Sequence, residues 1–312
     1  MPNWMLKAAI QGALSVLPWG NEINTFLQRH VTKRLVLTPR RFEVKVSQCR
    51  RHLEYAFDIW GNQRTSLAVL ELGTGWHPVI PVGLYLCGAS VVWTIDIEPL
   101  LLPASTVVVA RLFAEYAANG RLSEMLPWVR EDRVANIKRA LEEDVPDRTG
   151  SDLLKALLVN ARVGDARDTG IDSASVDLFV SNCVLEHIPR DVIVRIFREF
   201  KRVGAPGAVM SHLVDMSDHY ADADHSITPF NFLKYSDSTW RWFNSSLHYQ
   251  NRLRIQDYRQ IHNEAGFTIS REYNFQEAPS VLDSVRLASR FRGYSRADLL
   301  ITRGWFVSIG TS

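Results

Sequence analysis

Residues 69–78 read VLELGTGWHP and join an apolar run to a turn with two glycines and then to a helical segment. Glycine suits this turn because a side chain would keep a ligand away from the backbone, and because glycine accepts positive φ. A helix that begins after such a turn points free N–H groups at the same place. The pattern predicts a nucleotide-type binding site, and a purely structural turn is the alternative, since two glycines alone are a weak signal.

Further short apolar runs follow this one, and helical stretches separate them. Such alternation is typical of a parallel sheet covered by helices. We therefore predict an α/β fold with a Rossmann-like, seven-stranded, mostly parallel sheet and helices on both of its faces. The expected strands are 67–72, 91–95, 158–163, 176–181, 208–214, 267–273 and 299–309.

The remaining segments are expected to extend this sheet domain. We assign residues 1–62 to an N-terminal helical extension and 63–312 to one domain with insertions at about 100–157 and 216–266. The first insertion exceeds the length of a single crossover helix, so it is expected to hold extra helices. The second is rich in aromatic residues and is interpreted as a cap, whose aromatic side chains either line an acceptor site or form the core of the cap.

The first helix is amphipathic by its spacing. Leu6, Ile10, Leu14 and Leu17 recur on one face, which predicts that this face packs on the protein itself, and peripheral contact with a membrane surface is the alternative. No segment is apolar for the roughly 20 residues that a membrane span needs. We therefore predict no membrane span.

The net charge and the cysteine spacing argue against several classes of function. The 36 basic and 34 acidic residues give a formal charge of +2, which is too small for a nucleic-acid partner. Cys49, Cys87 and Cys183 show no CxxC spacing, so neither a disulfide framework nor a thiolate metal site is indicated. A reduced, cytoplasmic location is expected.

Asp96 ends the second apolar run, just over twenty residues after Gly73. An acidic residue at this place on the neighbouring strand can accept hydrogen bonds from both ribose hydroxyls. Hydrogen bonds to a charged group contribute about 1.5–3 kcal/mol each. A helix N-cap is the alternative role for this carboxylate.

Four segments together resemble the class I S-adenosylmethionine-dependent methyltransferases over about residues 66–215. They are ELGTG at 71–75, Asp96, VGDAR at 163–167 and VDLFVSNCVLEHIP at 176–189, the last being common in the branch that methylates small molecules. One departure is His77-Pro78, where many members have a third glycine. A dinucleotide oxidoreductase, the less favoured alternative, would also need a glycine where Pro78 stands.

The resemblance implies S-adenosylmethionine as cofactor and assigns roles to the matching residues. Gly73 and Gly75 would pass beneath the methionine part, Glu71 would help to hold its amino group, Asp96 would bind the ribose, and Asp165 would reach the adenine. The expected cofactor-binding residues are Glu71, Gly73, Thr74, Gly75, Asp96, Ile97, Asp165, Ala166, Asn182 and Cys183. A catalytically silent domain that binds the cofactor or a protein is the second hypothesis.

The expected reaction is methyl transfer to the oxygen or nitrogen of a small-molecule acceptor. Orientation of the reactants is the chief contribution, and a base adds about 10²–10⁴-fold. His187 and His212 are the candidate bases, since imidazole titrates near neutral pH; in the alternative, the Glu186-His187 pair caps the next helix.

Two polar segments each have two possible functions. Residues 212–225 contain seven His and Asp side chains, which either bind a metal ion or belong to a solvated loop, and we assign no metal to them. Arg252 and Arg254 either bind an acidic acceptor or lie at a solvent-facing helix start.

Overall fold

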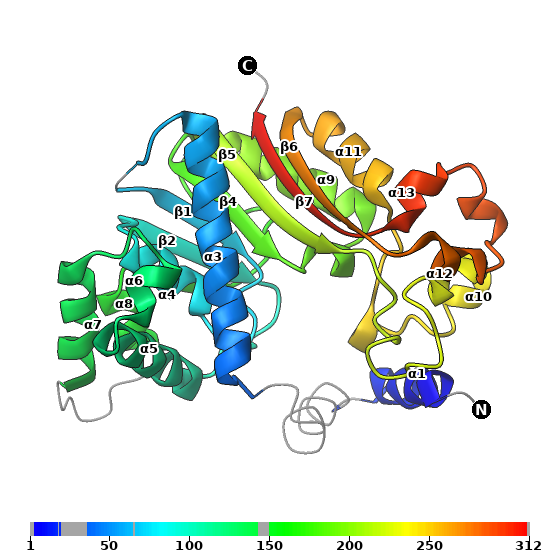
Figure 1. The fold of residues 1–312 in the computed structure, drawn as a ribbon, viewed down its shortest axis with the longest axis horizontal. Helices are drawn as coiled ribbons and strands as arrows, with labels where there is room; N and C mark the ends of the chain where they lie inside the picture. Colours follow the sequence, from blue (N-terminus) through cyan, green and yellow to red (C-terminus); the bar gives the residue numbers. More distant parts are fainter. Residues whose placement is uncertain (1–2, 18, 20–35, 65, 143–149, 311–312) are drawn as a thin grey trace.

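The computed structural model describes residues 3–17, 19, 36–64, 66–142 and 150–310, and its centre is a seven-stranded sheet (Figure 1). The strand order is β3-β2-β1-β4-β5-β7-β6, and β7 runs antiparallel to both of its neighbours, while β1 to β5 are parallel. This order confirms the predicted fold class. The strands are β1 (Ala68–Leu72), β2 (Val91–Asp96), β3 (Val159–Val163), β4 (Val176–Asn182), β5 (Gly204–Asp215), β6 (Phe267–Gln276) and β7 (Ile301–Gly310).

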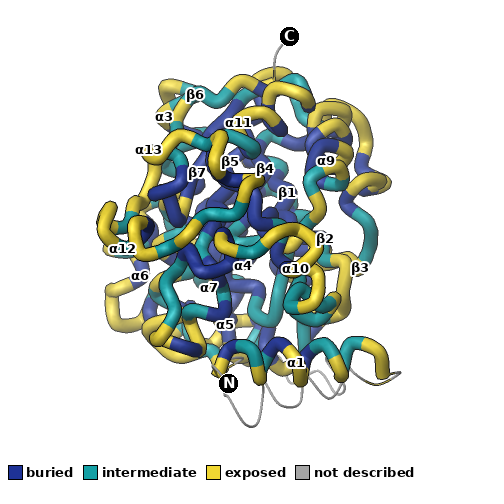
Figure 2. The backbone as a smooth tube through the Cα atoms, turned by 90° about the vertical axis from the view of Figure 1, so that its right-hand side faces the viewer, coloured by how far each residue is buried: buried dark blue, intermediate teal, exposed yellow. Residues whose placement is uncertain are grey.

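Helices cover both faces of the sheet, and each face has its own apolar core. Figure 2 shows the central strands buried between these layers. As expected, the first insertion holds extra helices. One face carries α3 (Pro39–Trp60), α4 (Val79–Leu86), α5 (Pro103–Ala118), α6 (Arg121–Met125), α7 (Glu131–Glu142) and α8 (Gly150–Ala156), and the other carries α9 (Arg190–Val203) and α11 (Ile255–Glu264).

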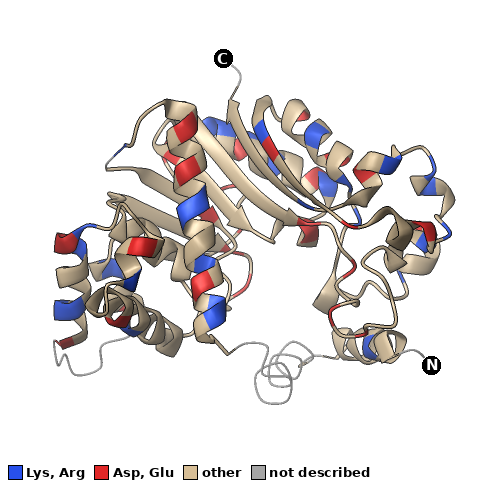
Figure 3. Cartoon of the chain, viewed as in Figure 1, with Lys and Arg blue, Asp and Glu red and all other residues tan. Residues whose placement is uncertain are grey.

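Helix α3 brings side chains from the N-terminal extension onto the sheet. The Thr38 hydroxyl accepts a hydrogen bond from Arg41 N, and Gly61 ends the helix at φ 68°, so a capping residue and a left-handed glycine set both ends. Phe42, Val46 and further residues at helical spacing are buried. The exposed side carries charges of both signs (Figure 3). The helix therefore belongs to the core of the sheet domain, while the domain boundaries given above stay a prediction.

The cap is larger than the sequence indicated. Its core joins aromatic residues of 216–250 to side chains between β6 and β7, such as Leu282 and Phe291. Conversely, α11 lies in the predicted insertion but covers the sheet. The short helices of the cap are η3 (Asn231–Lys234), α10 (Asp237–Trp240), η4 (Ser246–His248), α12 (Pro279–Asp283), η5 (Ser289–Phe291) and α13 (Arg296–Leu300).

Helix α1 (Asn3–Ser15) packs on this cap, but through a different face from the one predicted. Trp4 is 1% exposed, contacts three aromatic rings of the cap, and donates its backbone N–H to Asp224 at 3.0 Å. Leu6 and Ile10 are 54% and 48% exposed, so the prediction that their face packs on the protein is wrong. The large ring of Trp4 outweighs the smaller aliphatic stripe. None of the helices in the described ranges could cross a membrane.

Candidate active site

The glycine turn after β1 is closed on one side and open on the other. Gly73 has φ +83°, donates to Ile95 O at 2.8 Å, and lies against Val184, which a Cβ atom at position 73 would strike. Gly75 has φ +61°, and apart from its two chain neighbours no described residue has an atom within 4 Å of where its Cβ would be. Both positions require glycine for their φ angles, but only Gly75 faces open space.

Asp96 lies beside this turn, as predicted. Its Oδ2 accepts a hydrogen bond from Gly75 N at 2.9 Å, and its Oδ1 accepts one from Glu98 N at 3.2 Å. The alternative role as a helix N-cap is wrong, because α5 begins at Pro103. The neighbouring Ile97 is 70% exposed, so an apolar surface adjoins the carboxylate.

Glu71 is buried beneath the same turn with two threonines. Thr94 Oγ1 donates to Glu71 Oε2 at 2.6 Å, and the hydroxyls of Thr74 and Thr94 are 2.5 Å apart. Burial raises the pKa of Glu71 to about 8, against the opposing effects of Thr94 and Lys45. A cationic amino group beside this carboxyl would favour its ionised form.

Asp165 and Ala166 follow β3 at the same edge of the sheet. The Asp165 carboxylate binds the guanidinium of Arg167, with Nε 2.8 Å from Oδ2, and this hydrogen bond is the main cause of the lowered pKa of Asp165. Ala166 is buried. An adenine amino group would therefore share Asp165 with Arg167.

Asn182 is the last residue of β4, and Cys183 follows it. Asn182 Nδ2 is buried and has no hydrogen-bond partner in the part of the chain that the structure describes. Cys183 has φ +54°, a left-handed conformation that costs a non-glycine residue about 1–2 kcal/mol. Burial raises the pKa of the Cys183 thiol, so the thiol stays neutral.

His52 reaches this strand end from α3 and was not among the residues predicted from the sequence. Its Nε2 lies 3.2 Å from Asn182 Oδ1 and its Nδ1 lies 2.8 Å from Ser211 Oγ. Burial lowers the pKa of His52 to about 3, so the ring is neutral and donates from Nε2 to the amide oxygen, which only accepts. His52 thereby orients Asn182. The available signal was a histidine on the apolar face of the helix, three residues after Cys49.

The two candidate bases occupy different environments. His212 is fully buried, with Nδ1 2.8 Å from Ser181 Oγ and its ring stacked on Phe197, and desolvation lowers its pKa well below the usual range. His187 is exposed at the end of η2 (Leu185–His187). Desolvation by the surrounding protein also lowers the pKa of His187 below its usual value. A role as base is untested for both, and burial favours a packing role for His212.

Segment 212–225 does not gather its seven side chains into one metal site. Asp218 accepts from Asn231 Nδ2 at 2.9 Å, Asp224 binds the backbone of Trp4, and Asp215 lies 3.2 Å from Arg303. These three carboxylates are buried, so the reading as a solvated loop is also wrong for them. Of these seven side chains, His219 is the one that belongs to a group of three possible metal ligands in the described ranges, together with Glu186 and His187.

Arg252 and Arg254 are structural residues of the cap. They do lie at a helix start, since Arg254 is the N-cap of α11, but they are buried rather than solvent-facing. Arg252 is 3% exposed and donates to two backbone carbonyls and to Asp237. Arg254 is fully buried and donates to the carbonyls of Met216, Leu299 and Ile301. Neither guanidinium faces solvent or a cavity.

A cavity of about 640 Å³ lies between α3 and the ends of β5 and β7. It does not include the glycine turn or Asp96, but it adjoins Cys183, whose N–H donates to the carbonyl of the lining residue Leu213 at 2.8 Å. Its charged lining comprises four arginines and two glutamates: Arg40, Arg50, Arg51, Arg303, Glu43 and Glu124.

Comparisons with known proteins give one family match. Residues 123–211 match the family model described as "Methyltransferase domain", a span that covers β3, β4 and part of β5. The glycine turn and Asp96 precede this span. The chain has no significant match among curated proteins.

Several solved structures are similar in fold. A putative sarcosine dimethylglycine methyltransferase from Galdieria sulphuraria is 14% identical, with 84% of each chain covered and a TM-score of 0.45. Geranyl diphosphate C-methyltransferase from Streptomyces coelicolor A3(2) is 11% identical, with 84% of this chain and 80% of that chain covered and a TM-score of 0.45. Phosphoethanolamine N-methyltransferase 2 from Haemonchus contortus is 14% identical, with 92% and 60% covered and a TM-score of 0.46.

The sheet order agrees with the fold expected for a class I methyltransferase, and the family match covers residues 123–211 of that fold. Residues 123–211 are therefore similar to a methyltransferase domain, and S-adenosylmethionine is the cofactor that this similarity implies. The dinucleotide oxidoreductase alternative is wrong, because that fold has the order 3-2-1-4-5-6, whereas here the antiparallel β7 stands between β5 and β6. The open Gly75, the exposed Ile97 and the unpartnered amide of Asn182 fit the cofactor.

Proposed function

We propose that this enzyme methylates an oxygen or nitrogen of a small-molecule acceptor. The observation that carries the proposal is the open turn at Gly75, which follows β1 and is bound to the Asp96 carboxylate. Cys183, after the neighbouring strand β4, adjoins a cavity through its hydrogen bond to Leu213. Ligands of open α/β sheets bind at the carboxyl ends of the strands. Fold alone would not identify a substrate, so the chemistry of the site carries the argument.

The chain's own residues would bind and orient the reactants. S-adenosylmethionine supplies an electrophilic methyl group when bound. Asp96 would accept the ribose hydroxyls, Ile97 would cover the apolar side of the adenine, and Asp165 with Ala166 would bind its edge. Glu71 with Thr74 would hold the amino group, while Gly73, Gly75, Asn182 and Cys183 would shape the site. Orientation of this kind contributes on the order of 7–11 kcal/mol.

The acceptor is expected to enter the cavity beside α3. Of its four arginines, Arg50 pairs with Glu54 at 2.6 Å and Arg303 pairs with Asp215 at 3.2 Å. Arg40 and Arg51 have no ion pair among the described residues, and Glu43 is neutralised by Arg121 at 2.6 Å. Guanidinium groups bind carboxylates and phosphates through paired hydrogen bonds. We therefore propose an acceptor that carries an acidic group. Of the two candidate bases, His187 is the one with an exposed ring.

Calorimetry with S-adenosylmethionine and S-adenosylhomocysteine tests the cofactor site. Asp96→Ala is expected to weaken binding at least about 10-fold, because the lost hydrogen bonds contribute about 1.5–3 kcal/mol each. Asp168→Ala, an exposed aspartate near the site, is the control. Equal affinity of Asp96→Ala and the wild type would refute the assignment.

Turnover with methyl-labelled cofactor and a fractionated metabolite extract tests the acceptor class. The extract is separated on an anion-exchange column before the reaction, and labelled product is expected when the retained fractions supply the acceptor. Alkaline stability of the new bond separates esters from ethers and amines. Label found only in unretained fractions would refute an acidic acceptor but not methyl transfer itself.

A further inference from the structure

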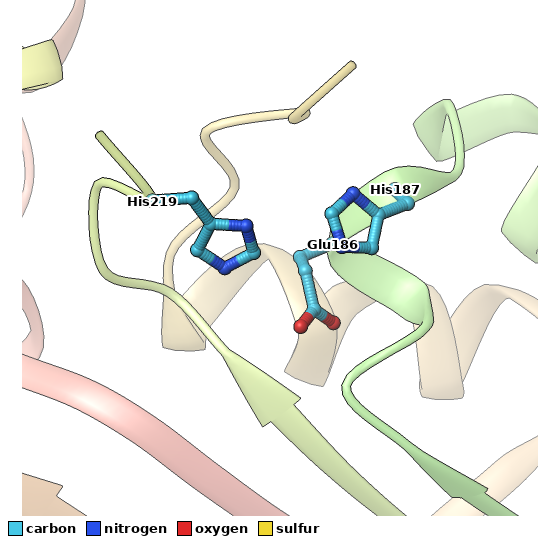
Figure 4. A group of neighbouring side chains, drawn as sticks. All are labelled: Glu186, His187 and His219. Atoms are coloured by element: carbon cyan, nitrogen blue, oxygen red, sulfur yellow. The ribbon is translucent and has the colours of Figure 1, made fainter. Parts of the chain in front are cut away.

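Three side chains that can ligate a metal ion converge outside the predicted cofactor contacts. Glu186 and His187 lie on η2, directly after β4, and His219 lies on the loop that follows β5 (Figure 4). One ligand atom of each lies within 4.8 Å of the others, and the two imidazole centroids are 5.1 Å apart. Residues 32 positions apart in sequence thus meet because β4 and β5 are neighbours in the sheet.

Hydrogen bonds hold these groups in place and leave lone pairs available. His187 Nδ1 lies 2.8 Å from Tyr249 O, and a carbonyl only accepts, so Nδ1 carries the proton and the neutral ring keeps its lone pair on Nε2. This arrangement, in which the second ring nitrogen donates to a carbonyl, is typical of metal-bound histidine. The loop of His219 is fixed by its backbone N–H, which donates to Gln250 Oε1 at 3.3 Å.

Glu186 supplies the second, independent observation. Its side chain is 1% exposed, and neither carboxylate oxygen has a hydrogen-bond partner among the side chains of the described residues. A buried carboxylate is normally paired with a cation or with donor side chains, because leaving it unpaired is costly. Figure 4 shows this carboxylate beside the two imidazoles.

We propose that Glu186, His187 and His219 bind one divalent transition-metal ion. Two imidazoles and one carboxylate suit Zn²⁺, Fe²⁺ or Co²⁺, whereas Mg²⁺ and Ca²⁺ prefer sites built from oxygen alone. Ligand atoms about 2.0–2.2 Å from one cation lie roughly 3–3.5 Å apart in tetrahedral geometry, so side-chain rotations must bring these three groups closer. Three protein ligands leave a coordination position open for another molecule.

The charges around the cluster are compatible with a cation. The Asp215 carboxylate acts electrostatically on all three side chains, and Arg303, its partner at 3.2 Å, partly offsets it. Lys7 adds a weaker positive influence at His219. Asp215 is anchored by Ser217 N at 2.9 Å, which places it as an outer support rather than as a fourth ligand.

Metal binding at this cluster does not require that the protein transfers methyl groups. A role for the metal in catalysis does rest on the proposed function. Val184 packs against Gly73 and its carbonyl accepts from His187 N at 2.9 Å, so the cluster adjoins the cofactor turn. A cation there can lower the pKa of a bound acceptor hydroxyl. In that case His187 acts as a ligand and not as the base, because one lone pair serves only one of these tasks.

The protein is first stripped of metal with a chelator. Binding of Co²⁺ is then followed by visible absorption, and binding of Zn²⁺ to a separate sample is measured by calorimetry. We expect one equivalent to bind. His219→Gln and Glu186→Gln are each expected to weaken binding at least about 100-fold, which corresponds to about 2.7 kcal/mol. His225→Gln, an exposed histidine on the same segment, is the matched control and should bind like the wild type.

S-adenosylhomocysteine binding is measured for each variant and shows whether it is folded. Absence of Co²⁺ and Zn²⁺ binding by wild-type protein that binds S-adenosylhomocysteine would overturn the proposal. Unchanged metal affinity in a folded His219→Gln or Glu186→Gln variant would also overturn it. Because His219→Gln leaves His187 in place, retained turnover by metal-free His219→Gln would show that His187 works without a metal. Failure of the methyl-transfer assay alone would leave the metal result standing.

Discussion

At the scale of single residues, the two glycines of the turn differ in what surrounds them. Gly73 is enclosed by Val184, while Gly75 faces open space beside Asp96. Both have positive φ, so a side chain at either position costs about 1–2 kcal/mol in backbone strain. Steric overlap is added only at Gly73, where it costs about 1–3 kcal/mol more.

Gly73→Ala is therefore expected to lower the free energy of unfolding by about 2–5 kcal/mol. Gly75→Ala should lose only about 1–2 kcal/mol, yet it should weaken S-adenosylhomocysteine binding strongly, because the new methyl group enters the space assigned to the cofactor. Urea unfolding measures the first quantity and calorimetry the second. A Gly75→Ala variant that binds S-adenosylhomocysteine like the wild type would place the cofactor elsewhere.

Residue patterns predicted the parts of the site that are local in sequence. Gly73, Gly75 and Asp96 follow from runs that end at adjacent strands, and the structure brings Gly75 and Asp96 together. The contact of His52 with Asn182 was not predictable, because it depends on where α3 crosses the sheet. The meeting of His219 with Glu186 likewise depends on the path of the loop after β5, which no periodicity encodes.

At the scale of elements, strand positions were predictable and the cap was not. Apolar runs placed the buried strands, such as β1 and β4, because a strand that is buried on both faces needs continuous apolar residues. The strands β3 and β6 are largely exposed, and their positions were predicted from shorter apolar runs. The cap consists of short helices and loops joined by polar contacts between distant segments, so its extent past β6 left no pattern. Arg254 is the clearest case, since a charged residue in sequence suggests a surface, yet its side chain is fully buried.

Arg254→Met is expected to destabilise the protein by about 3 kcal/mol or more, because it leaves three carbonyl acceptors without their donor. These carbonyls belong to Met216, Leu299 and Ile301, so the cap should loosen from the sheet. Urea unfolding and proteolysis within residues 216–250 measure the effect. Arg241→Met, on the exposed side of the cap, should change stability by less than about 0.5 kcal/mol. Equal stability of the two variants would contradict this account.

At the scale of the whole molecule, burial of ionisable groups makes stability depend on pH in two opposing directions. Burial lowers the pKa of His262 to about 4 and that of His52 to about 3. It raises the pKa of Glu71 to about 8 and that of Asp218 to about 6. The buried histidines lower the free energy of unfolding as pH falls below 6.5, their pKa in the unfolded chain. The buried carboxyls lower it as pH rises above the pKa values that they have in the unfolded chain.

His262 allows one of these contributions to be isolated. Its ring packs against Phe197 and Phe306 in the layer between α9, α11 and the sheet, so His262→Phe retains the shape. In the unfolded chain this histidine takes up a proton near pH 6.5, whereas in the folded chain it does so near 4. The free energy of unfolding of the wild type therefore decreases as pH falls from about 6.5 to about 4. His262→Phe has no proton to take up at this position, so it does not show this decrease.

The stability of His262→Phe relative to the wild type should therefore improve by about 2 kcal/mol between about pH 7.5 and pH 5, because 1.5 pH units below 6.5 correspond to about 2 kcal/mol. The other titrating groups are present in both proteins, so their contributions cancel in the difference. Urea unfolding at the two pH values measures it, and His212→Phe should behave alike, since desolvation also lowers the pKa of His212. A difference that is constant with pH would mean that the folded protein already holds a proton at His262.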